Sequence, residues 1–337
     1  MTLIASHPNA LTPRSPVEPA VDAFLEYLDQ EGRSSRTGRA YRADLRQFVR
    51  FLHTHVRETA PSLGGIDEAA TRAFVAELEL RGARPSTVRR KLAAVRAFGR
   101  YLTAAGILSR NPARSVAGPD AEPASRPVPA LGQIEAALAL VPQSSFAGAR
   151  AQAMVAVLYG GGLRLGELVD LNLTSVDLDE GHVHVPRRRG SARVVPLGPP
   201  AVSALRRYLP RRAESLIDRD IASVEAGALF VNERGRRLHR RSIQRIVRTC
   251  LEEAGQALIQ RAATGAEGAT ATVLTEGEVG PRALRRAFAA HLLDAGADVV
   301  SVRDLLGQDA LPAAGRGPDL DVSELRARYE QAHPRAR

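Results

Sequence analysis

The sequence predicts a mainly α-helical protein of two domains that also carries a small antiparallel β-sheet. Segments with apolar residues at helical spacing dominate both halves of the 337-residue chain. Hydrophobic residues make up 44% of the composition but aromatic residues only 4%, so aliphatic side chains must fill the core, which suits packed helices. Residues 117–130 are rich in Pro, Ala and charge without an apolar period, which is typical of a linker.

The N-terminal domain is expected to span residues 17–116, after a disordered tail at 1–16. Its apolar spacing predicts four helices, the third of which Asp67 can cap and Gly82 can end. The fourth helix, from about residue 86 to 105, carries three arginines on one flank: Arg89, Arg96 and Arg100. Such a flank is either a solvated face or a DNA-contacting surface.

The C-terminal domain is expected to span residues 131–337. Two runs of alternating or β-branched residues, HVHVP and ARVVPL, flank the turn RRRGS and predict a β-hairpin with a basic tip. Helices are predicted near residues 134–140, 151–159, 242–258, 283–295 and 300–306.

Charge and composition favour nucleic acid as the partner. The formal net charge is +10, and a surface of this sign attracts polyanions and releases their counterions on contact. Cys250 is the sole cysteine, so an internal disulfide is impossible. Neither a signal-peptide segment nor an apolar run of membrane-spanning length occurs, so we expect a cytoplasmic, nucleoid-associated protein that does not bind membranes.

No cofactor or metal is expected. His182 and His184 alternate on a predicted strand and could share a face, but no third metal ligand is evident. The glycines at 160–162 lack the Lys-Ser/Thr of a phosphate-binding P-loop, so we interpret them as a tight turn.

Several motifs, taken in order, resemble those of tyrosine recombinases of the phage integrase family. GLRLGEL at 162–168 is similar to the family's first arginine motif, and PRALRR at 281–286 is similar to its second. LLG at 305–307 and AHPRA at 332–336 resemble the Xer branch specifically. The resemblance covers about residues 20–337. It implies a SAM-like helical core-binding domain and an α+β catalytic domain that together clamp double-stranded DNA, assemble as an oligomer on it, and need no metal.

The resemblance also implies a site, with departures from the family pattern. Arg164 and Arg285 match the two arginines that bind the nonbridging phosphate oxygens. Arg188 stands in place of the hairpin lysine. Arg282 and Arg286 stand in place of the two histidines of the second arginine motif, and Gln308 in place of the histidine expected after LLG. These changes keep positive charge but remove groups that titrate near neutral pH. Glu167 could orient Arg164 or simply form a helix salt bridge.

The family's nucleophilic tyrosine falls on Gly317, which has no side-chain atom that can attack phosphorus. Tyr329 is the sole tyrosine in the last hundred residues, but it lies in a segment similar to the family's C-terminal tail helix, where a packing role is the simpler interpretation. Further DNA-facing residues implied by the resemblance are Arg240, Arg241 and Arg245.

These observations predict a duplex DNA-binding protein of the Xer type, acting in site-specific recombination, integration or chromosome maintenance. Membership of the family implies a DNA strand transferase, but the vacant nucleophile position predicts a protein that does not cleave. Its partner could then be a homologous, active recombinase. Two alternatives stay open: an active recombinase that uses Tyr329 or a partner's tyrosine, and a nucleoid-type binder without sequence preference.

Overall fold

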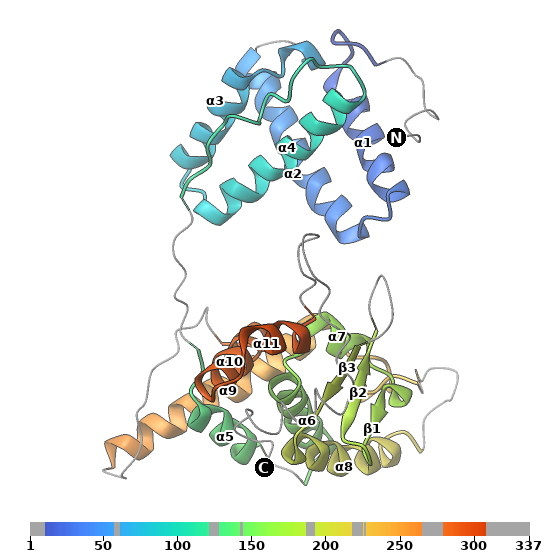
Figure 1. Cartoon of the computed structure of the whole chain (residues 1–337), viewed down its shortest axis with the longest axis vertical. Helices are drawn as coiled ribbons and strands as arrows, with labels where there is room; N and C mark the ends of the chain where they lie inside the picture. The colour runs from blue at the N-terminus through green and yellow to red at the C-terminus, as the bar shows by residue number, and fades with distance from the viewer. Residues whose placement is uncertain are drawn as a thin grey trace. The chain divides into compact units, whose positions relative to one another are not determined.

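The computed structural model describes residues 11–56, 61–120, 128–141, 144–186, 193–217, 225, 227–264 and 279–307. Contacts divide the chain into two compact units, Met1–Ala124 and Ser125–Arg337, and the division falls inside the segment predicted as a linker. Both units are mainly helical, and the second contains a three-stranded antiparallel sheet, which confirms the predicted fold class (Figure 1).

The first unit is built from four helices around an aromatic centre. Every helix contributes at least one phenylalanine to this centre, with ring centroids 5.6 Å apart for Phe24 and Phe98 and 5.0 Å apart for Phe48 and Phe74. The Asp67 side chain accepts a hydrogen bond from the Ala70 N–H (2.7 Å), as a helix cap does. The helices are α1 (Val17–Gln30), α2 (Ser35–Val56), α3 (Glu68–Leu80) and α4 (Pro85–Ala104).

A buried ion pair joins α2 to α4. The Asp44 carboxylate on α2 is only 2% exposed and lies against Arg90 and Lys91 of α4, with Lys91 Nζ 3.1 Å from Oδ1. Because Lys91 is the only lysine in the chain, its charge is used for this contact within the fold.

The second unit is organised around α6, whose residues from Gly148 to Gly160 are all buried. A helix that is buried on every side is a core helix, and α6 packs against α5, α8, α9 and α10 (Figure 1). The helices are α5 (Leu131–Leu140), α6 (Phe146–Gly160), α7 (Leu165–Asp170), α8 (Pro199–Glu214), α9 (Arg240–Ala263), α10 (Pro281–Asp294) and α11 (Val299–Leu305). Within the described ranges, no helix combines the length and apolarity needed to cross a membrane.

The sheet of this unit consists of β1 (Val176–Asp177), β2 (His182–Val185) and β3 (Arg193–Pro196) in that order. Val183 pairs with Val195, and both are fully buried, so this face of the sheet packs on the core. The predicted hairpin strands are therefore present, while the tip of the hairpin at 187–192 lies outside the described residues.

Two helices of this unit, the short α7 and the longer α8, were not among those predicted. Helix α8 begins with Pro199 and Pro200 and contains Pro210. Proline is tolerated in the first turn of a helix because the N–H that it lacks has no partner there. A proline pair that suggests a turn thus starts a helix instead.

Candidate active site and nucleic-acid interface

The two arginines of the predicted phosphate site come together beside the end of α6. Nη1 of Arg285, on α10, donates a hydrogen bond to the carbonyl of Gly162 (2.5 Å), two residues before Arg164. Gly162 has φ +55°, and a Cβ built on it would lie 2.5 Å from the Phe288 ring. Only glycine fits this turn, because it combines a left-handed backbone with close packing on α10.

Glu167, in the first turn of α7, orients Arg164. Its carboxylate accepts hydrogen bonds from the Arg164 backbone N–H (2.7 Å) and from Arg164 Nη1 (2.8 Å). Nη1 of Arg285 lies 3.9 Å from Oε2 of the same carboxylate. Burial raises the pKa of Glu167, but hydrogen bonds from Arg193 and Arg164 and the charge of Arg193 outweigh burial and lower the pKa to about 2. Glu167 is therefore ionised at neutral pH.

Sequence reasoning missed Arg193, which completes the cluster from β3. Nη1 and Nη2 of Arg193 donate to the two carboxylate oxygens of Glu167 at 2.8 and 2.9 Å, a bidentate pair. The available signal was strand register. Arg193 lies two residues before buried Val195 and therefore shares the face of β3 that points toward the core, where an arginine requires a partner. We name Arg164, Glu167, Arg193 and Arg285 the arginine cluster.

Backbone carbonyls after α11 hold the cluster from the other side. Nη2 of Arg285 donates to the Leu306 carbonyl (2.6 Å), and Nη2 of Arg164 donates to the Gly307 carbonyl (3.2 Å). The Arg164 side chain remains 49% exposed, whereas that of Arg285 is 14% exposed. The cluster can therefore present guanidinium groups to the nonbridging oxygens of a phosphate, with Arg164 outermost.

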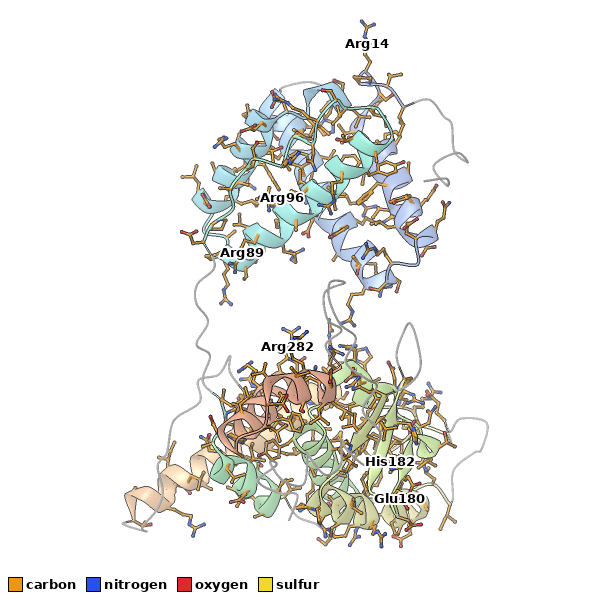
Figure 2. All side chains as sticks on the ribbon, viewed as in Figure 1. Arg14, Arg89, Arg96, Glu180, His182 and Arg282 are labelled. Atoms are coloured by element: carbon orange, nitrogen blue, oxygen red, sulfur yellow. The ribbon has the colours of Figure 1, made fainter. Side chains whose placement is uncertain are left out.

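Four further predicted residues lie on α9 and α10. A Cβ built on Gly166 would lie 2.6 Å from Nη1 of Arg240, so the start of α9 packs against α7 beside the arginine cluster. Arg241 and Arg245 are exposed on α9. Arg282 is exposed in the first turn of α10, one turn before Arg285 (Figure 2). Arg188, Gln308, Gly317 and Tyr329 lie outside the described residues.

The predicted basic flank of α4 is only partly available to DNA. Arg96 donates hydrogen bonds to the carbonyls of Ala113 (3.0 Å) and Val116, so its guanidinium anchors the chain that follows α4. Arg100 is exposed and Arg89 is half-buried near the start of the helix (Figure 2). Arg96 thus has a structural role, which makes it a weaker candidate than the other two.

Helix α2 carries a longer basic stripe that sequence reasoning missed. Five arginines recur at intervals of three or four residues, which places them on one helical face, and all five are exposed. The spacing in SRTGRAYRADLRQFVR was the signal that could have revealed it. The members of this α2 stripe are Arg36, Arg39, Arg42, Arg46 and Arg50.

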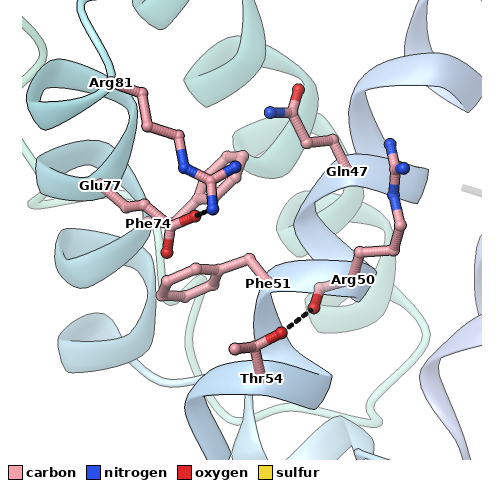
Figure 3. Close-up of a pocket in the computed structure, with 7 residues that line it drawn as sticks. All are labelled: Gln47, Arg50, Phe51, Thr54, Phe74, Glu77 and Arg81. Atoms are coloured by element: carbon pink, nitrogen blue, oxygen red, sulfur yellow. Dashed lines mark hydrogen bonds and ion pairs between the residues drawn. The ribbon is translucent and has the colours of Figure 1, made fainter.

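A pocket between α2 and α3 borders the stripe (Figure 3). Phe51 and Phe74 line it together with polar side chains, and Arg81 at its rim is paired with Glu77 at 2.6 Å. Arg50 of the α2 stripe also lines this pocket, so we interpret the pocket as an extension of the basic α2 surface.

The two histidines on β2 lie side by side. Their Nε2 atoms are 3.0 Å apart, on the face of the strand opposite the buried valines. In the part of the chain that the structure describes, no group of three metal-ligating side chains forms.

An arginine cluster beside a small sheet in a mainly helical protein is chemically suited to bind a phosphodiester, and comparison with known proteins identifies the family. The model of the phage integrase family matches residues 132–311, and that of the phage integrase N-terminal SAM-like domain matches residues 21–106. The chain belongs to the phage integrase family and is a Xer-like tyrosine recombinase, a class that acts in site-specific DNA recombination.

Relatives align over nearly their full length. The chain is 33% identical to tyrosine recombinase XerC of Pelotomaculum thermopropionicum, an alignment that covers 94% of this chain and 98% of that relative. It is 35% identical to the XerC of Azotobacter vinelandii, over 94% of this chain and 96% of the relative. The XerC of Myxococcus xanthus is 34% identical, over 95% and 99%.

Solved structures support the fold. A XerH site-specific recombinase bound to palindromic difH substrate matches with a TM-score of 0.66 at 16% identity, over 90% of this chain and 92% of that chain. A lambda integrase dimer bound to a core site matches with a TM-score of 0.61 at 16% identity, over 88% and 96%.

Proposed function

We propose that this chain binds duplex DNA as a Xer-type subunit that holds the phosphodiester backbone but does not cut it. One combination carries the proposal: an arginine pair organised around Glu167, and glycine at position 317, where the family resemblance places the nucleophilic tyrosine. Glycine offers no oxygen to attack phosphorus, so the first chemical step has no nucleophile at the usual position.

The other departures affect the second requirement of cleavage, which is a proton donor. When a tyrosine oxygen bonds to phosphorus, the bond to the 5′-oxygen breaks, and that oxygen must take up a proton. Arg188 stands where the family has lysine, and Gln308 where it has histidine. A guanidinium with a pKa above about 12 binds phosphate well but is a poor acid at neutral pH.

Affinity for DNA comes from cations spread over both units. Phosphate contacts supply most of the affinity and make it depend on salt, whereas few residues read bases. On the first unit the candidates are Arg89, Arg100 and the α2 stripe, and on the second they are Arg240, Arg241, Arg245 and the arginine cluster. We further propose that the protein acts in the nucleoid as an oligomer on DNA, beside a homologous recombinase that retains its tyrosine.

The test is a nicked suicide duplex, which traps a covalent protein–DNA adduct that survives SDS. The wild-type protein alone should form none. Gly317→Tyr is the matched variant, because it adds a tyrosine hydroxyl at this position and leaves the arginines unchanged. An adduct with the wild-type protein that Tyr329→Phe abolishes would refute the proposal and identify Tyr329 as the nucleophile.

Competition between duplexes separates this proposal from a general nucleoid binder. A Xer-type subunit should prefer its specific site over random duplex at a fixed salt concentration. Equal affinity for both duplexes would instead favour binding without sequence preference.

A further inference from the structure

We infer that Arg193 is a positioning residue of the proposed phosphate site, which neutralises Glu167 so that Arg164 and Arg285 keep their charge for DNA. This inference rests on the proposed function, and it concerns a residue that does not itself contact DNA.

Burial separates the role of Arg193 from that of Arg164. The Arg193 side chain is 7% exposed, against 49% for Arg164. Both of its terminal nitrogens are occupied by the two oxygens of Glu167, at 2.8 and 2.9 Å. Arg193 Nε is also buried and has no hydrogen-bond partner among the described residues. A guanidinium enclosed in this way, with both terminal nitrogens bonded to Glu167, cannot reach a phosphate outside the protein, so any effect that it has on DNA must act through Glu167.

The charge balance of the cluster shows what that effect is. Three guanidinium groups and one carboxylate give +3 − 1 = +2. Without Arg193 the sum is +2 − 1 = +1, and the carboxylate is left with Arg164 at 2.8 Å and Arg285 at 3.9 Å. Glu167 would then pair with the arginines that the phosphate requires, and the two anions would compete.

Arg193 also supports the second contact of Arg164. Gly307, whose carbonyl accepts a hydrogen bond from Arg164, has φ +57°, and a Cβ built there would lie 3.0 Å from Cδ and Nε of Arg193. The Arg193 side chain therefore packs under the turn at Gly307 while it binds Glu167. Both groups that hold Arg164 rest on the same buried side chain.

The experiment measures the affinity of the full-length protein for duplex DNA by fluorescence anisotropy over a range of salt concentrations. Arg164→Ala should weaken binding roughly tenfold and reduce the slope of log K against log salt by about 0.9, the value for one phosphate contact. Arg193→Met should do the same although Arg193 does not touch DNA. The double variant Glu167→Gln/Arg193→Met restores the charge of +2 and should recover affinity to within about threefold of wild type.

Arg150→Met is the matched control, since Arg150 is a buried arginine of the same unit that pairs with Glu233 at 2.9 Å and donates to the Val231 carbonyl. It should lower the unfolding temperature but leave the salt slope unchanged. If Arg193→Met does not fold, Arg193→Gln takes its place, because it is also neutral but keeps an amide donor for Glu167.

The outcomes are distinct. A folded Arg193 variant with the wild-type slope overturns the inference, and so does a double variant as weak as Arg193→Met. In either case a reduced slope in Arg164→Ala leaves the proposed function standing. An unchanged slope in both Arg164→Ala and Arg193→Met overturns the proposed phosphate site, and the inference with it.

Discussion

Replacing Glu167 by glutamine should destabilise the C-terminal unit by an amount that shrinks in acid. The fold lowers the pKa of Glu167 from its ordinary value of 4.5 to about 2. Because each unit of pKa corresponds to about 1.4 kcal/mol, ionised Glu167 contributes about 3 kcal/mol to the free energy of unfolding at neutral pH. The side chain is only 13% exposed, so solvent screening reduces this value little.

The sign of the pH dependence follows from the lowered pKa. The contribution is fully present above pH 4.5, and it is lost as the pH falls from 4.5 through about 2, where the folded protein also takes up the proton. Wild-type protein should therefore lose about 3 kcal/mol more than Glu167→Gln across this window.

The assay is urea unfolding followed by far-UV circular dichroism at a series of pH values, for wild type and Glu167→Gln in parallel. The curve of unfolding free energy against pH should be steeper for the wild type below pH 5, and the two curves should converge near pH 2. Two parallel curves would show that Glu167 is not held as an ion by its arginine partners, and the electrostatic account of the cluster would be wrong.

Three further predictions concern packing, the buried ion pair and the α2 stripe. Gly162→Ala should lower the free energy of unfolding by about 2–5 kcal/mol, because a left-handed alanine costs about 1–2 kcal/mol and overpacking against Phe288 adds the rest. Gly296→Ala is the control, since Gly296 also has a positive φ but open space around it, and calorimetry should show only the backbone cost of about 1–2 kcal/mol. Asp44→Asn should destabilise the first unit by about 3 kcal/mol in urea unfolding, because it leaves Lys91 without its buried partner. Asp22→Asn breaks the exposed pair with Arg42 and should change the free energy of unfolding by less than about 1 kcal/mol. Arg46→Gln should reduce the slope of log K against log salt for DNA binding by about 0.9, whereas Arg72→Gln should leave it unchanged because Arg72 pairs with Glu68 on α3. Equal slopes in the two variants would exclude the α2 stripe from the DNA interface.

Local signals predicted most of the fold. Helical spacing located the four helices of the first unit, and Asp67 and Gly82 bounded α3 because capping and a positive φ (+70° at Gly82) depend only on neighbouring residues. Helix α8 was not predicted because its two opening prolines are compatible with both a turn and the first turn of a helix. Helix α8 packs against α6, and because this packing is not local, the local sequence pattern does not distinguish the two possibilities.

The sequence predicted those residues of the candidate site that lie within recognisable motifs. The motif arginines Arg164 and Arg285 do come together, whereas Arg193 lies outside both motifs and is recognised only from the register of β3. Arg96 shows the opposite limit, because its position on α4 is as expected, but the chain that folds back at residues 113–116 occupies its guanidinium. Periodicity gives the face on which a side chain lies, but not the segment that returns to cover it.

Under the proposed function, the arginine cluster would hold DNA without taking part in its cleavage. The cluster carries an excess of two positive charges in a partly buried site. The pKa of Arg285 is lowered to about 10 by burial and by the charge of Arg164, although the charge of Glu167 acts in the opposite direction. Arg285 still carries its proton at neutral pH, so the repulsion remains in the DNA-free protein. A phosphate bound at the proposed site would relieve this repulsion, and its binding would need neither an acid nor a nucleophile. This separation underlies the proposed function: Arg188, Gln308 and Gly317 stand where the resemblance implies the proton donors and the attacking oxygen, whereas Arg164 and Arg285 match the phosphate-binding arginines.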